Sequence, residues 1–152
     1  MSKRILTLIF VFLVTMTLSA QWPPEKPKAA GVPAYNKTAP AKGVKLPAIL
    51  TKDELWGDDA QSPFQTHAYE LASKISGTIH QMPCYCYCDR MGHKSLHSCF
   101  EGKHGAQCDI CLKELYYVYG QKKKGQTVAQ IRKGVIAGDW KKITPEDAVA
   151  LN

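Results

Sequence analysis

The stretch AQCDICLKELYYVYG, Ala106 to Gly120, has the residue spacing of a buried amphipathic helix. Its cysteines and large apolar residues recur every three or four positions, which is the repeat of one helix face. Lysines 122–124 and Gly125 follow, and cations and glycine are typical of a helix C-terminus. We therefore expect a central helix whose core-facing stripe consists of Cys108, Cys111, Leu112, Leu115 and Tyr119.

A second helix is predicted before the central one. Ser62 is followed by Pro63 and stands three residues before Gln65, which is a capping box with proline at the first helical position. Apolar residues at helical spacing continue from there to about His80. Pro83 then ends the helix, since the residue before a proline avoids the helical conformation.

Three shorter helices complete the prediction. One covers about His93 to Phe100, one follows the capping box of Thr127 and Gln130, and one begins at TPED, residues 144–147. No segment has the alternating pattern of a strand. The sequence therefore predicts an all-α fold, a small bundle of about four short helices with a Cys-rich connecting loop.

The N-terminal third differs in composition from the rest. Residues 1–20 contain two cations, then an uncharged apolar run of 14 residues, then small residues, which is typical of a signal peptide cleaved after Ala20. That run is shorter than the ~20 residues of a membrane-spanning helix, although an uncleaved anchor is the alternative. Residues 21–61 are rich in proline, lysine and alanine, so we expect a disordered linker. Residues 62–152 form the predicted Cys-rich domain.

This organisation predicts an exported protein of the periplasm, cell envelope or extracellular space, with no membrane span after signal cleavage. Removal of residues 1–20 lowers the formal net charge from +7 to +5. The only dense cationic run, lysines 122–124, lies at a predicted helix end, so we expect no nucleic-acid partner. The chain has no glycine-rich phosphate loop and therefore no predicted nucleotide. No histidine follows Cys111 directly, so covalent haem attachment is not expected.

All six cysteines lie between Cys84 and Cys111. Three of them occupy alternate positions in PCYCYCDR, residues 83–90. In an extended chain such residues point to the same side, so we expect a row of three sulfurs that faces Cys108 and Cys111 on the central helix. The distant sulfurs are then predicted to converge at the joint between two helices.

Soft-metal binding is the first use that this convergence favours. Cu(I) and Zn(II) prefer thiolate ligands, and closely spaced cysteines chelate with little loop entropy. We expect copper or zinc as the metal. The leading ligands are Cys84, Cys86, Cys88, Cys108 and Cys111, and the secondary candidates are Cys99, His93, His97 and His104.

Two other uses of the cysteines stay open. Cys108 and Cys111, near a helix N-terminus, have the spacing of a redox pair that would exchange with Cys84 and Cys86 and with a thiol redox partner protein. If the protein is an enzyme, it is then a thiol–disulfide oxidoreductase. Alternatively, six cysteines form three structural disulfides in an oxidising compartment, with connectivity that sequence does not define.

The segment MPCYCYCDRMGHKSLHSCFEGKHGAQCDICLKE, followed by TVAQIRKG, resembles the bacterial exported proteins named for a PCYCGC or CYCXC motif. That family is one of unknown function. Its selenoprotein members imply that selenium can replace sulfur in the motif, which favours a reactive or metal-binding role. Tyr87 stands where the PCYCGC form has glycine. If that glycine lets the chain turn tightly around a ligand, its replacement by Tyr87 argues against the same turn here, whereas a tyrosine at a variable position would be harmless.

Overall fold

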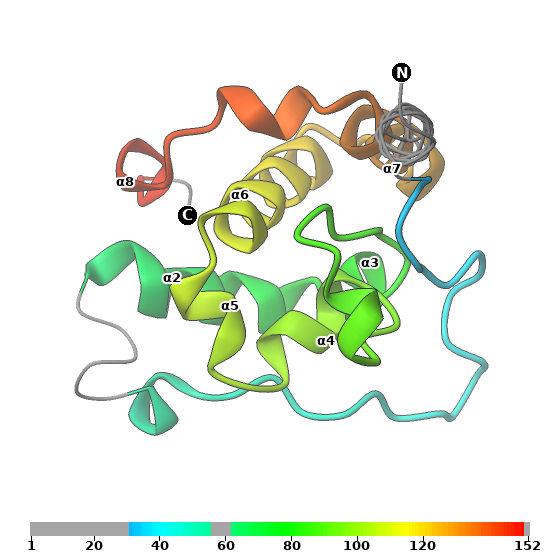
Figure 1. Ribbon diagram of the computed structural model, residues 1–152, viewed down its shortest axis with the longest axis horizontal. Coiled ribbons are helices and arrows are strands. Elements are labelled where there is room, and N and C mark those ends of the chain that lie inside the picture. The colour runs from blue at the N-terminus through cyan, green and yellow to red at the C-terminus, as the bar shows by residue number, and fades with distance from the viewer. Residues whose placement is uncertain (1–30, 56–61, 151–152) are drawn as a thin grey trace, which may run out of the picture. The chain divides into compact units, whose positions relative to one another are not determined.

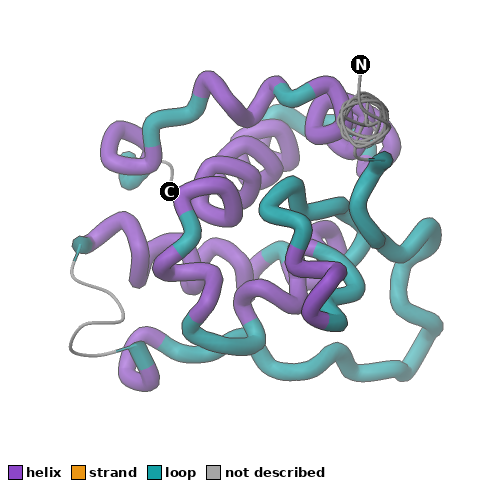
Figure 2. The backbone as a smooth tube through the Cα atoms, viewed as in Figure 1, coloured by secondary structure: helices purple, strands orange, loops and turns teal. Residues whose placement is uncertain are grey.

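The computed structural model describes residues 31–55 and 62–150. The chain divides into two compact units, residues 1–31 and 32–152, and the described part belongs almost entirely to the second. The predicted signal peptide lies outside the described residues. Within them all regular secondary structure is helical and no strand occurs (Figures 1 and 2), which confirms the all-α prediction.

Seven α-helices and three 3₁₀ turns lie in the described part of the chain. They are η1 (Lys52–Glu54), α2 (Pro63–Lys74), α3 (Ser76–Ile79), η3 (Cys88–Met91), α4 (Leu96–Phe100), α5 (His104–Gln107), α6 (Asp109–Lys123), α7 (Val128–Ala137), η4 (Asp139–Lys142) and α8 (Pro145–Ala148). The predicted first helix is divided into α2 and α3 because Ile75, with φ −124° and ψ 25°, leaves the helical conformation. The structure therefore has more helices than the small bundle of about four that was predicted, and most of them are short.

Helix α6 is the centre of the domain. It contacts α2, α4 and α5 as well as α7, η4 and α8 (Figure 1). Neighbours on several sides bury more than one face of the helix, so its buried set is wider than the predicted stripe. The buried residues are Cys111, Leu112, Glu114, Leu115, Tyr116, Tyr117, Val118 and Tyr119.

The predicted helix starts are present. The backbone N–H of Ser62 donates to Gln65 Oε1 at 2.8 Å, and that of Thr127 donates to Gln130 Oε1 at 2.9 Å. These bonds hold the cap residues in the extended conformation that lets each helix begin directly after them. Local polar residues therefore determine where α2 and α7 start.

The proline-rich segment lies against the helical domain. As expected, residues 31–51 contain no regular structure. The segment is nevertheless attached: Asn36 Nδ2 donates to the carbonyl of His80 at 3.0 Å, and the N–H of Leu50 donates to the carbonyl of Phe100 at 3.1 Å. Leu55 is buried in the core. The described part of the linker is therefore docked on the domain.

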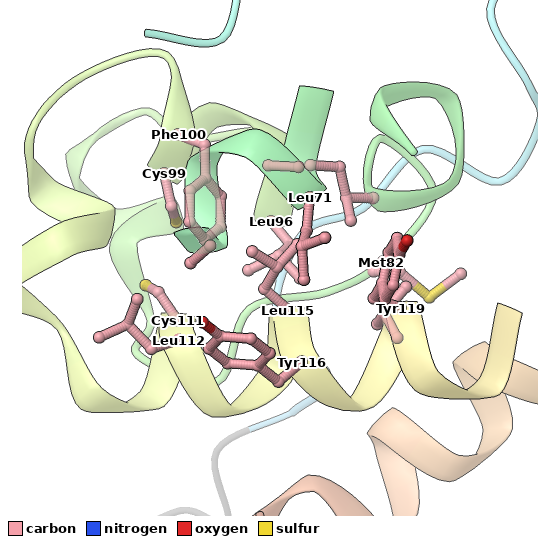
Figure 3. Packing of buried hydrophobic residues seen from close by; sticks show 14 of the residues in the cluster. Leu71, Met82, Leu96, Cys99, Phe100, Cys111, Leu112, Leu115, Tyr116 and Tyr119 are labelled. Atoms are coloured by element: carbon pink, nitrogen blue, oxygen red, sulfur yellow. The ribbon is translucent and has the colours of Figure 1, made fainter. Parts of the chain in front are cut away.

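The core joins α2, α4 and α6. Tyr69 and Phe100 meet edge to face, with ring centroids 4.9 Å apart, and Leu115 is fully buried beside them. Figure 3 shows Cys99 and Cys111 at one end of this core, on α4 and α6, with their sulfur atoms directed toward each other. The apolar core therefore continues directly into a group of cysteines. Among the described residues, no helix has the length and apolar character needed to cross a bilayer.

Candidate metal centre

The loop that carries the first three cysteines is a turn. The N–H of Tyr87 donates to the carbonyl of Cys84 at 3.2 Å, and Cys88 begins η3. Tyr87 has φ 58°, the left-handed region, and it is the one described non-glycine residue with positive φ. The prediction that residues 84–88 form an extended chain is therefore wrong. The chain folds back on itself instead, and this curvature brings the sulfurs closer together than an extended strand would.

Distances within the turn are short. The sulfur of Cys86 lies 3.1 Å from that of Cys84 and 2.6 Å from that of Cys88. Both separations exceed the ~2.05 Å of a disulfide bond, and all six cysteines are free thiols. The structure therefore does not contain the three structural disulfides of the alternative prediction.

Donors from three further helices reach the turn. Cys111, in the first turn of α6, places its sulfur 3.5 Å from Cys84 and 3.6 Å from Cys86. His104 begins α5, and its Nε2 lies 2.8 Å from the sulfur of Cys88. Cys99 comes from α4, and Cys108 is the N-cap residue of α6. The predicted convergence of distant sulfurs is therefore observed.

We call the six cysteines with His104 the cysteine–histidine cluster. It contains three overlapping groups of four donor atoms, and within each group all donors lie within 4.8 Å of one another. The inner set is Cys84, Cys86, Cys99 and Cys111. The first outer set is Cys86, Cys88, Cys99 and His104, and the second outer set is Cys86, His104, Cys108 and Cys111. Four close donors are the number that a tetrahedral ion requires, so the cluster is able to hold a metal ion.

The three candidate histidines have different surroundings. His104 is a donor in both outer sets. His93 lies in the loop before α4, which begins only at Leu96, and its Nδ1 is 3.4 Å from the sulfur of Cys99. His97 turns away: its Nδ1 lies 2.8 Å from Glu101 Oε1, and its side chain is 1% exposed. The structure therefore does not bring His97 to the cluster, because α4 places it on the face toward His80.

The Cys86 thiol takes part in hydrogen bonds with several other thiols of the cluster. The thiols of Cys108, Cys111 and Cys84 donate to its sulfur and lower its pKa well below the usual range. The pKa of Cys111 is raised, because hydrogen bonds with Cys108, Cys84 and Cys86 hold it in the thiol form. Burial raises the pKa of Cys88. The lowered pKa of Cys86, which is half-buried, favours its thiolate form.

A buried carboxyl supports the cysteine turn. Glu114 is fully buried on α6, and its Oε1 accepts a hydrogen bond from the N–H of Tyr85 at 2.8 Å. Burial raises its pKa from 4.5 to about 8. The sequence interpretation missed this residue. Its position three residues after Cys111 places both on the same side of α6, which is the signal that indicates it.

The described residues define a small all-α domain with a largely buried cysteine–histidine site. Comparison of the chain with protein-family models, with curated proteins and with solved structures gives no match in any of the three.

Proposed function

We propose that this protein binds a soft metal ion, copper or zinc, through the thiolates of the cysteine–histidine cluster. The observation that carries this proposal is the meeting of four donors within 4.8 Å from separate parts of the fold. Sulfur-rich donor sets favour Cu(I) and Zn(II) over harder cations such as magnesium or calcium. Soft metals are the best-supported ligands because most donors of the cluster are cysteine sulfurs, and this conclusion does not depend on a single sequence motif.

The sulfur separations of the inner set are compared with those of a tetrahedral ion. With metal–sulfur bonds of ~2.3 Å, tetrahedral geometry requires sulfur separations of roughly 3.8 Å. The sulfur of Cys111 is 3.5 Å from Cys84 and 3.6 Å from Cys86, near this separation, whereas the sulfurs of Cys84 and Cys86, now 3.1 Å apart, would have to move apart. A bound cation would replace thiol protons and compensate the negative charge of thiolates that are otherwise costly to bury. It would also connect the cysteine turn with α4 and α6.

Two features of the sequence support export of this domain. Residues 1–20 have the order of charged, apolar and small residues of a secretory signal peptide. The resemblance of residues 69–135 to the PCYCGC or CYCXC proteins of bacteria points in the same direction, since many members of that family look like exported or lipid-anchored proteins. We therefore propose metal handling in the periplasm, the cell envelope or outside the cell.

Native mass spectrometry tests this function. The full chain is isolated from its own compartment under mild conditions and weighed before and after a strong chelator. We expect a mass excess equal to copper or zinc that the chelator removes, together with thiols that become reactive to alkylation after metal loss. A chain that carries no metal and takes none up, while all six thiols are reduced, would contradict the proposal.

A second candidate function is thiol–disulfide exchange, which the contact between Cys86 and Cys88 favours. Their sulfurs are 2.6 Å apart, and the lowered pKa of Cys86 provides a ready thiolate. A partner disulfide would accept the two electrons and become a dithiol, while these two cysteines form the new bond. A ring closed by residues only two apart is strained and therefore reactive. Alkylation and mass spectrometry after treatment with oxidised glutathione would show this bond.

A further inference from the structure

The cluster has more donors than one ion can use. Seven donor atoms come together, whereas a soft metal ion is complete with four and Cu(I) with fewer. Three cysteines or histidines are therefore left beside any single ion placed in one set. Thiolates left without a cation would be costly to bury. This excess is the starting point of an inference that rests on the proposed function and extends it.

The overlap between the sets shows how further ions would be held. Cys86 belongs to all three sets. The inner set shares Cys99 with the first outer set and Cys111 with the second, so ions in the inner and an outer set would have two thiolates in common. A thiolate sulfur has several lone pairs and can bridge two ions, whereas an imidazole nitrogen has one. Cys86 is therefore placed to bridge.

Burial distinguishes the two levels of the cluster. In the inner set Cys84, Cys99 and Cys111 are buried and only Cys86 is partly exposed. To the inner set, the first outer set adds buried Cys88 and partly exposed His104, and the second adds partly exposed Cys108 and His104. The first ion would therefore enter the inner set, and a further ion would join it from the solvent side across the shared sulfurs.

Charge favours Cu(I) over Zn(II) for this arrangement. Two dications repel each other four times as strongly as two monocations at the same separation. Monovalent copper is also satisfied by two or three thiolates, so fewer donors are needed for each ion. Bridging sulfurs and low coordination number together allow several Cu(I) ions within one group of six cysteines.

We propose that the cysteine–histidine cluster holds two or more Cu(I) ions as a single thiolate-bridged centre, with Cys86 as the common bridging ligand. The inner set forms its buried base, and the outer sets form the part that exchanges ions with solvent or a partner. The protein would then act as a carrier or store of several copper ions and not as a site for one.

The test is an anaerobic titration of the reduced full chain with Cu(I), followed by native mass spectrometry in the presence of a competing Cu(I) chelator. The wild-type chain is expected to pass from the metal-free form to species with at least two copper ions. The same titration with Zn(II) is expected to stop at one ion. Circular dichroism verifies that each chain remains helical.

Two serine variants locate the bridge. Cys86→Ser removes the one donor that all three sets share, so it is expected to lose the bridge and to hold fewer copper ions than the wild-type chain. Cys88→Ser is the matched control, because it removes a donor from the first outer set alone and leaves two sets complete. It is expected to retain at least two ions. Equal copper counts in the two variants would overturn the bridging role of Cys86.

The number of Cu(I) ions that the wild-type chain binds decides the stoichiometry, independently of the results for the two variants. A wild-type chain that saturates at one Cu(I) overturns the multinuclear centre while the proposed metal-binding function stands. A chain that retains no copper and no zinc against the chelators overturns both. Two zinc ions with a single copper ion would overturn the charge argument and the assignment to Cu(I).

Discussion

Metal removal is expected to lower the thermal stability of the domain substantially. A ligand that binds only the folded chain stabilises it by RT ln(1 + [L]/Kd), about 4 kcal/mol when the free metal is 1,000 times the dissociation constant. The folded unit spans residues 32–152, and for this size 1 kcal/mol corresponds to about 4 °C in Tm. We therefore expect a chelator to lower Tm by about 15 °C, because the cysteine turn, α4 and α6 lose their common ligand.

The assay is thermal unfolding followed by circular dichroism, with Zn(II) or with excess chelator, under reducing conditions. Cys111→Ser removes a donor from two of the three sets, so the Tm difference between the two conditions is expected to shrink strongly. His97→Asn is the control: this histidine contacts Glu101 and not the cluster, so the difference should persist even if both Tm values fall. Equal Tm values with and without metal in the wild-type chain would refute the reasoning.

Three further predictions concern the frame around the cluster. Tyr87→Gly relieves the positive φ of 58° and should raise stability by about 1 kcal/mol in urea unfolding, whereas a loss would show that the tyrosine side chain matters more. Gly134→Ala places a Cβ against the Tyr117 hydroxyl and should cost about 1–3 kcal/mol, while Gly77→Ala, with open space around it, should be neutral or stabilising in the same assay. Burial raises the pKa of Glu114 from the ordinary value of 4.5, which applies to the unfolded chain, to about 8 in the folded chain. The metal-free folded chain therefore binds this proton more tightly than the unfolded chain, and its stability should fall as pH rises from 4.5 to about 8. Glu114→Gln should flatten that pH dependence in urea titrations, and an unchanged slope would contradict the assignment.

Local sequence signals were sufficient for the starts of α2 and α7. The capping boxes of Ser62 and Thr127 predicted the starts of α2 and α7 because they act through residues only three positions away. The break at Ile75 was not predictable, since neither glycine nor proline marks it.

The site was predictable in membership but not in geometry. Clustering of cysteines near the joint of two helices indicated that Cys84 and Cys111 would meet. The prediction of an extended backbone for residues 84–88 was wrong. Alternation of cysteine and tyrosine favours an extended chain, and a tyrosine, unlike a glycine, does not indicate the positive φ that Tyr87 adopts. His93 and His97 were predicted to lie on one helix that begins at about His93. The observed helix, α4, begins three residues later, at Leu96, so His93 lies in the preceding loop and the two side chains have different surroundings.

X-ray absorption at the metal edge of the loaded full chain tests the central claim most directly, because it reports the atoms bound to the ion. If the cysteine–histidine cluster binds the ion, we expect a coordination shell dominated by sulfur, at ~2.3 Å for zinc, with at most one nitrogen from His104. A shell of nitrogen and oxygen atoms alone, at ~2.0–2.2 Å, would contradict it.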